Sequence, residues 1–248
     1  MADGMNQVSG VRAIVCDTGG TVFDWHTAVA DALADQGGRR GIVADWPAVT
    51  KTWRRLSTRM VDRGLPKDAG RITMDMDDVL SVTLDETLVS HDVHGFSDED
   101  RRALVHSWRS MPAWPDILPG VAALRTAYPV APFTILKAAL VVEASRRSGV
   151  SWDAVISCEM IGEYKTHPAT YHTAARWLDV PIESLLLVTT HNNDLDAGHA
   201  LGLRTAFVYR PDEWADEASD DPEPSPNADL VASDFVDLAR QLGCVTGR

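Results

Sequence analysis

The sequence lacks the features that would tie it to an oxidising compartment or to a membrane. It has three cysteines with no CxxC spacing, and two of them lie in apolar runs, so we expect reduced thiols and a cytoplasmic protein. No apolar run approaches the roughly 20 residues of a membrane helix. The first ten residues also lack the apolar stretch of a secretory leader. We therefore predict neither a leader nor a membrane partner.

Positive charge is also scarce. The chain has 23 Lys and Arg against 36 Asp and Glu, a formal net charge of -13 at pH 7. Such a surface disfavours nucleic acid and anionic lipid, so we predict neither as a partner. A local basic cluster can still bind a small anion. With 248 residues, the chain can bury a full core in one large domain or two modest ones.

The most informative stretch lies near the start, where residues 11–25 read VRAIVCDTGGTVFDW. The apolar run at residues 13–16 predicts a buried parallel strand, and Asp17 with Gly19 and Gly20 predicts a sharp turn at its end. This end of a strand lies at the ligand-binding edge of an open α/β sheet. The glycines would let backbone amides surround the Asp17 carboxylate and keep it ionised, as a nucleophile requires. The alternative is that Asp17 only stabilises the turn.

The rest of the chain divides into a helical block and an alternating block. Helical periodicity, with no strand, fills the stretch between residues 25 and 110, and a glycine pair at 37–38 is expected to end its first helix. After a Pro-rich segment, strands and helices alternate, with an acidic surface loop at residues 212–227. The expected helices span residues 27–36, 45–63, 75–89, 98–108, 120–128, 141–148, 168–178, 194–201 and 235–242, and the expected later strands span residues 130–136, 152–157, 184–189, 204–209 and 230–231.

This order predicts the fold class. Strands that alternate with helices form a parallel sheet with right-handed crossovers. We therefore predict an α/β protein with a Rossmann-like parallel-sheet core, residues 1–25 and 111–248, and an inserted helical cap domain, residues 26–110. Polar clusters follow three of the later strands, at the same edge as Asp17. They read TILKAA at residues 134–139, EYKTHP at 163–168 and TTHNND at 189–194.

With these motifs in order, the chain resembles the haloacid dehalogenase superfamily and, within it, the type II L-2-haloacid dehalogenases. DTGGT, YKTHPATY and HNNDLDAGHALGLRTAFVYRP carry the resemblance, which covers nearly the whole chain. It implies a hydrolase with an aspartate nucleophile, no cofactor, a small carboxylate substrate and the option of a homodimer. The catalytic residues it implies are Asp17 as nucleophile, Thr21 as support for its carboxylate, Lys165 as the motif lysine, Asp194 as the late acid and His191, where some members have Asn.

The resemblance also implies the substrate contacts. Arg54, in the Trp53-Arg54 pair of the cap, would hold the departing halide, although its helix also carries other arginines. The substrate carboxylate would rest on backbone amides near the glycine pair and the turn at residues 136–138. The residues predicted to bind substrate are Arg54, Gly19, Gly20, Lys137, Ala138, Tyr171 and Asn193.

Two positions separate this chain from the phosphatases of the superfamily. Those enzymes use a second aspartate, two residues after the nucleophile, as general acid for the leaving alcohol, and a further acid, four residues before the late aspartate, to help hold Mg2+. Here these positions are Gly19 and Thr190. Octahedral Mg2+ prefers oxygen ligands such as carboxylates. We therefore predict a metal-independent enzyme, with no metal site, that displaces halide from a small 2-haloalkanoic acid through an aspartyl ester. An Mg2+-dependent phosphatase is a weaker alternative.

Lys137-Ala138 departs from the family pattern, which has Ser-Asn there. Lys137 could anchor the substrate carboxylate by its charge. It could instead pair with Asp17, which would leave a catalytically impaired binding protein. A third alternative keeps the aspartyl ester but changes the leaving group, as in the ring opening of a small carboxylic acid.

Overall fold

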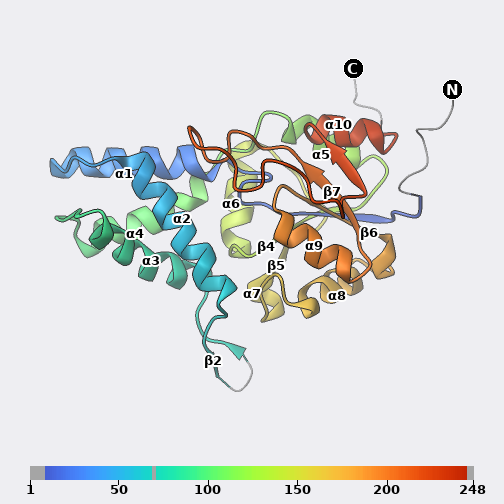
Figure 1. Cartoon of the computed structure of the whole chain (residues 1–248), viewed down its shortest axis with the longest axis horizontal. Helices are drawn as coiled ribbons and strands as arrows, with labels where there is room; N and C mark the ends of the chain where they lie inside the picture. Colours follow the sequence, from blue (N-terminus) through green and yellow to red (C-terminus); the bar gives the residue numbers. More distant parts are fainter. Residues whose placement is uncertain (1–8, 69–70, 245–248) are drawn as a thin grey trace.

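The computed structural model describes residues 9–68 and 71–244, and a six-stranded sheet forms its core (Figure 1). Every neighbouring pair of strands in this sheet is parallel. The strand order is β5 (Ile156–Ser157), β4 (Val130–Thr134), β1 (Ala13–Cys16), β6 (Leu185–Thr189), β7 (Arg204–Val208) and β8 (Leu230–Ala232). The α/β fold with a parallel-sheet core is therefore confirmed.

The central position of β1 explains where ligands can bind. All residues of β1, β4 and β6 are buried, as expected for strands covered on both faces. The chain extends the sheet on one side of β1 through β4 and β5, and on the other side through β6, β7 and β8. This reversal of strand order opens a crevice beyond the carboxyl ends of the central strands.

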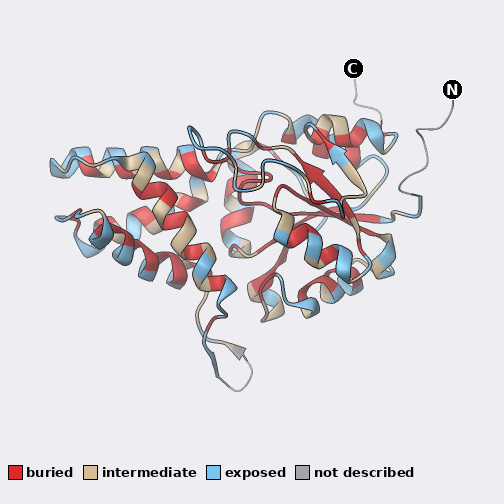
Figure 2. Ribbon diagram, viewed as in Figure 1, coloured by how far each residue is buried: buried red, intermediate tan, exposed pale blue. Residues whose placement is uncertain are grey.

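Helices cover both faces of the sheet. Figure 1 shows α5 and α10 on one side of the sheet and α8 and α9 on the other, and Figure 2 shows the buried strands between these layers. The helices of this part are α5 (Ile117–Leu124), α6 (Ala138–Ser148), α7 (Cys158–Ile161), α8 (Pro168–Trp177), η2 (Ile182–Ser184), α9 (Asn192–Ala200) and α10 (Phe235–Gln241).

A second group of helices follows the first strand and its turn, and packs beside the sheet (Figure 1). Buried tryptophans fill its interior: the Trp53 indole donates a hydrogen bond to the Leu80 carbonyl at 2.9 Å, and its ring meets Trp108 edge to face. These helices are α1 (Trp25–Arg40), α2 (Trp46–Asp62), α3 (Met76–Ser90), α4 (Asp98–Ser107) and η1 (Trp108–Ser110). We call this group the cap and the sheet with its helices the core. The domain boundaries given above stay predictions.

The first cap helix does not end at the glycine pair. It continues to Arg40 and is terminated by Gly41, which has φ +67° and is capped by bonds to the carbonyls of Gly37 and Gly38. Gly37 serves packing instead, because a Cβ there would lie 2.3 Å from an atom of the Trp46 ring. The glycine thus lets α1 and the start of α2 approach closely.

The expectation of no strand in the cap is also wrong. β2 (Lys67–Asp68) and β3 (Arg71–Ile72) pair antiparallel after α2, and the residues between them lie outside the described part. Two-residue strands are too short for apolar alternation to reveal. The prediction about a secretory leader rests on the first ten residues, and residues 1–8 of these lie outside the described part of the chain. Within the described ranges, no helix combines the length and apolarity needed to cross a bilayer.

Candidate active site

The carboxylate of Asp17 lies just beyond the end of β1 and is 8% exposed. Its own N–H donates to the carbonyl of Val188 at the end of β6, which fixes the backbone there. Thr21 Oγ1 donates to Asp17 Oδ2 at 2.9 Å, and Lys165 Nζ donates to Oδ1 at 3.2 Å. Within the described ranges, side chains surround this carboxylate and backbone amides do not, contrary to the expectation. The Gly20 N–H donates instead to the carbonyl of Phe23.

These contacts keep Asp17 charged. Burial by itself raises the pKa of a carboxyl group, but Lys165, His191 and Thr21 outweigh it and hold the pKa of Asp17 well below its usual range. The carboxylate is therefore ionised at neutral pH. It combines charge with restricted access to water, which suits a nucleophile.

Lys165 joins the two predicted acids. Its Nζ lies 2.8 Å from Asp194 Oδ2 as well as 3.2 Å from Asp17 Oδ1. Burial opposes the ammonium charge, but Asp194 and Asp17 outweigh it and raise the pKa of Lys165. Tyr171 was predicted to bind substrate, yet it is fully buried and its hydroxyl donates to Asp194 Oδ1 at 2.6 Å. Tyr171 therefore orients Asp194 from within the core and does not line the cavity.

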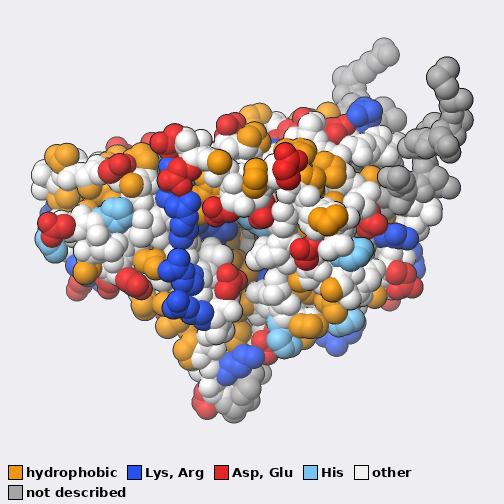
Figure 3. Space-filling model, viewed as in Figure 1, with side chains coloured by type: hydrophobic (Ala, Val, Ile, Leu, Met, Phe, Trp, Pro, Cys, Tyr) orange, Lys and Arg blue, Asp and Glu red, His pale blue; other side chains and the backbone are white. Residues whose placement is uncertain are grey.

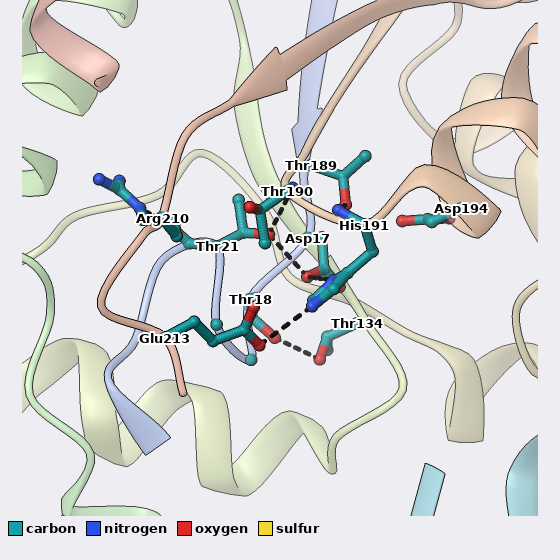
Figure 4. A network of polar contacts seen from close by, with 12 residues as sticks. Asp17, Thr18, Thr21, Thr134, Thr189, Thr190, His191, Asp194, Arg210 and Glu213 are labelled. Carbon is teal, nitrogen blue, oxygen red and sulfur yellow. Dashed lines mark hydrogen bonds and ion pairs between the residues drawn. The ribbon is translucent and has the colours of Figure 1, made fainter. Parts of the chain in front are cut away.

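The turn that carries Thr21 is fixed by residues from distant parts of the chain. Thr21 Oγ1 accepts a hydrogen bond from the N–H of Thr190 at 3.1 Å (Figure 4). Arg210 Nε donates to the Thr21 carbonyl at 2.8 Å, and the same guanidinium forms a bidentate pair with Asp116 at 3.0 and 2.8 Å. The sequence interpretation missed Arg210, which lies two residues after β7, at the same edge of the sheet as Asp17.

A cavity of about 470 Å³ opens above Asp17, between the core and the cap. Of the residues predicted to act in the site, those that line the cavity are Asp17, Gly19, Arg54, Lys165, His191, Asn193 and Asp194. Arg54 Nη2 lies 3.5 Å from the carbonyl of Gly19, and the guanidinium carbon lies 5.6 Å from the centre of the Trp25 ring. Among the described residues, Arg54 forms no ion pair. Its charge is thus available to an anion in the cavity.

Other arginines of α2 have different surroundings. Figure 3 shows a row of Lys and Arg side chains over α2, where the cap borders the core. Arg55 in this helix is paired with Glu217 at 2.8 Å and lies over the ring of Trp214. Arg54, in contrast, is 7% exposed and lies against the carbonyl of Gly19, in the turn that follows Asp17. The structure thus separates Arg54 from the solvated arginines of the same helix.

Besides Tyr171, three residues predicted to contact substrate do not line the cavity. Lys137 Nζ pairs with Asp75 at 2.7 Å and Asp77 at 3.3 Å, both at the start of α3 in the cap, so it contacts neither Asp17 nor the cavity. The Ala138 N–H donates to Glu159 Oε1 at 2.8 Å and is not free for a substrate. Gly20 supports the turn through its carbonyl, which accepts from the Trp114 indole at 2.7 Å.

His191 lies between two carboxylates (Figure 4). Its Nδ1 is 3.2 Å from Asp17 Oδ2, and its Nε2 is 3.1 Å from Glu213 Oε1. Glu213 is 1% exposed, although it belongs to the acidic stretch interpreted as a surface loop. Its position five residues after the last residue of β7 is the signal that could have indicated a role in the site.

Fold and site together define the class of protein. A buried aspartate after the first strand, a lysine that links it to a late aspartate, and a helical cap inserted behind the first turn are the arrangement of the haloacid dehalogenase superfamily. Neither a protein-family model nor a curated protein sequence matches the chain.

Solved structures give the family. A defluorinating L-2-haloacid dehalogenase is 32% identical, with a TM-score of 0.88, and the match covers 94% of this chain and 96% of that one. Another L-2-haloacid dehalogenase is 30% identical, with a TM-score of 0.86 and coverage of 94% and 99%. The chain belongs to the L-2-haloacid dehalogenases. The enzyme from Xanthobacter autotrophicus, solved with chloropropionic acid covalently bound, shares the fold at 19% identity, a TM-score of 0.75 and coverage of 94% and 98%.

Proposed function

We propose that the protein is a metal-independent hydrolase that displaces halide from a small 2-haloalkanoic acid through an ester on Asp17. One observation carries the proposal: the ionised carboxylate of Asp17 and the guanidinium of Arg54, which no described carboxylate pairs with, line the same cavity. A nucleophile and an anion site in one cavity suit displacement of a leaving group as an anion.

In the first step, an oxygen of Asp17 bonds to the carbon that bears the halogen, and the carbon–halogen bond breaks with inversion. The halide leaves with the bonding electron pair and needs no proton, so no general acid is required. Arg54 would stabilise the negative charge that develops on the halogen. The substrate carboxylate would be held within the same cavity, which Arg55 and Arg59 also line.

In the second step, water adds to the carbonyl carbon of the Asp17 ester. The ammonium group of Lys165 contacts both Asp17 and Asp194. Asp194 would take a proton from the water. Collapse of the tetrahedral intermediate releases a 2-hydroxy acid and restores the Asp17 carboxylate. The product would have the opposite configuration at its second carbon.

The residues around Asp17 argue against the phosphatase alternative. Gly19 replaces the general acid of the phosphatases, Thr190 replaces an acid that helps them hold Mg2+, and the Lys165 ammonium links Asp17 with Asp194. The remaining alternatives, ring opening and a protein impaired by Lys137, both assumed that Lys137 reaches the site. Its pairing with Asp75 and Asp77 removes that support.

Halide release tests the proposal directly. The purified protein should release chloride from L-2-chloropropionate without added metal and in the presence of a chelator. Fluoroacetate belongs in the same panel, because the 32% identical relative is a defluorinating enzyme. Asp17→Asn should release none. Absence of halide from every small haloacid, or Mg2+-dependent hydrolysis of p-nitrophenyl phosphate, would contradict the proposal.

A further inference from the structure

Glu213 has an unusual position for a residue in an acidic loop. Its carboxylate is buried, and Oε1 accepts hydrogen bonds from the Trp25 indole at 3.0 Å and from His191 Nε2 at 3.1 Å. An ionised carboxylate in such a place is destabilising unless it is paired. Burial raises the pKa of Glu213, but His191, Arg54 and Trp25 outweigh it and lower that pKa, so the group remains charged.

The glycine pair of the first turn makes room for this carboxylate. Gly20 has φ +95°, and a Cβ built on it would lie 2.1 Å from Glu213 Oε1. Any side chain at this position would therefore displace Glu213 from His191. The requirement for glycine at position 20 comes from Glu213 as well as from the turn itself.

His191 can satisfy both of its carboxylate neighbours only when both ring nitrogens carry a proton. Nδ1 faces Asp17 Oδ2 and Nε2 faces Glu213 Oε1 (Figure 4). Burial favours the neutral ring, but Glu213 and Asp17 outweigh it and raise the pKa of His191 to about 10. An imidazolium cannot accept a proton from water, so His191 serves as a donor and not as a base.

We infer that Glu213 is a positioning residue, which holds His191 as an imidazolium so that His191 and Thr21 together stabilise the oxyanion formed on Asp17 Oδ2. This inference rests on the proposed function. It is carried by the chain of contacts that runs from Trp25 through Glu213 and His191 to Asp17.

The geometry gives each oxygen of Asp17 a separate part in ester hydrolysis. Oδ1, next to Lys165, forms the bond to the substrate carbon, and Oδ2 remains the carbonyl oxygen. When water adds to Cγ, the electron pair of the carbonyl moves to Oδ2, which already has Thr21 Oγ1 at 2.9 Å and His191 Nδ1 at 3.2 Å as donors. Two donors aimed at the developing charge make an oxyanion hole.

The protons and bonds balance in this step. One water proton passes to Asp194, and collapse of the intermediate breaks the Cγ–Oδ1 bond. The departing alkoxide, beside Lys165, takes the proton from Asp194 and leaves as the hydroxyl of the product. The oxygen of water stays on Asp17, which loses the second proton to solvent and becomes a carboxylate again.

Several charges face His191, and Glu213 is decisive among them. Glu213 and Asp17 favour its protonation and burial opposes it, while Asp194, Lys165 and Arg54 line the same cavity. The Asp17 carboxylate is also shared with Lys165. Replacing Glu213 with a neutral side chain removes the carboxylate at Nε2. The His191 titration should then move down toward neutral pH.

Glu213→Gln tests this, with Glu223→Gln as the matched control, because Glu223 lies exposed on the same loop. The wild type and control should keep releasing halide up to about pH 9, whereas Glu213→Gln should lose about tenfold of kcat between about pH 6 and pH 9. Mass spectrometry should show the Asp17 ester accumulating in that variant at high pH. Glu213→Asp keeps the charge and should restore much of the high-pH activity.

The titration of His191 by NMR, assigned by comparison with His191→Asn, gives a readout apart from activity. It should lie near pH 10 in the wild type, and at least about one unit lower in Glu213→Gln. A wild-type titration near the ordinary 6.5 would overturn the inference even if the variant did not fold. Identical pH profiles for Glu213→Gln and Glu223→Gln would overturn it too. A wild type that releases no halide from any haloacid would instead overturn the proposed function, and with it the step assigned to His191.

Discussion

Two regions of the molecule contain ion pairs of the same chemical kind in opposite surroundings. The buried network lies at the edge of the sheet and comprises Asp17, Lys165, Asp194 and Glu213, whose side chains are at most 11% exposed, together with His191, which is 23% exposed where it lines the cavity. The boundary pairs join cap to core and comprise Arg55–Glu217, Lys67–Glu163 and Lys137–Asp75, with side chains that are 23–45% exposed. Loss of one partner leaves an uncompensated charge only in the first region. Water and salt screen the second.

The difference shows that the reacting groups are held rigidly, whereas part of the contact between the cap and the core can adjust. The reacting groups are fixed because each buried charge needs its partner to remain in place. The cap is joined to the core partly through pairs that contribute little to stability and that salt can weaken. Four predictions test this comparison, from the largest expected effect to the smallest.

Removal of a lysine should distinguish the two regions most sharply. Lys165→Met leaves Asp17 and Asp194 buried without their shared cation, so we expect the free energy of unfolding to fall by about 3–5 kcal/mol. Lys137→Met removes a partly exposed partner of Asp75 and should cost less than about 1 kcal/mol. Urea unfolding at neutral pH measures both. Equal losses would contradict the comparison.

Arg54 should matter for activity far more than a solvated arginine of the cap. Arg54→Ala removes a buried cation of the cavity that no described carboxylate pairs with, and kcat/KM for halide release should fall by about 100-fold or more. Arg101 pairs with Asp85 on the exposed side of the cap, so Arg101→Ala should retain activity within about twofold. The measurement is steady-state halide release from L-2-chloropropionate. Similar losses in the two variants would mean that Arg54 does not act on the leaving group.

The charge on His191 should appear in the dependence of stability on pH. Glu213 and Asp17 outweigh burial and raise the pKa of His191 from 6.5 to about 10. Because the folded pKa is the higher one, this stabilisation is complete below pH 6.5 and is lost as pH rises toward 10. The urea midpoint should therefore fall over this range in the wild type, and fall less in His191→Asn. Parallel curves for the two proteins would show that His191 is neutral in the folded state.

Salt should reveal the smallest effect. At about 1 M NaCl the screening length is about 3 Å, so the cost of Lys137→Met should shrink toward zero while that of Lys165→Met persists. Urea unfolding of both variants at low and high salt, each against the wild type, measures the change. A salt-insensitive cost for Lys137→Met would place its pair with Asp75 among the buried interactions.

The pattern of apolar residues and the positions where strands end were enough to predict the parallel sheet and the edge at which the site lies. The apolar runs before Asp17 and before residues 189–194 are buried strands because both faces of the sheet are covered, and such strands read as continuous apolar stretches. The carboxyl ends of parallel strands meet at one edge. That rule brings the ends of β1 and β6 together, and with them Asp17 and Asp194, whereas Lys165 lies beyond the helix α7 that follows β5 and its contacts with both acids come from the structure.

Contacts between distant segments were beyond such reasoning. Gly37 permits close packing against Trp46, but in sequence it resembles a helix terminator. Lys137 follows a strand as a site residue would, yet it pairs with acids of the cap that no local pattern connects to it. Glu213 belongs to an acidic stretch, and only the position of His191 in space explains its burial.

The contact between Arg210 and Asp116 has a consequence for recombining this protein with its relatives. Asp116 also accepts a hydrogen bond from the N–H of Phe235 at the start of α10, while Arg210 holds the carbonyl of Thr21. Four segments that are far apart in the sequence, at Thr21, Asp116, Arg210 and Phe235, are thus joined by this ion pair. A chimera that takes its first strand and its last helix from different parents would have to inherit both Arg210 and Asp116. Without both, the turn that follows Asp17 would lose the contact at the Thr21 carbonyl.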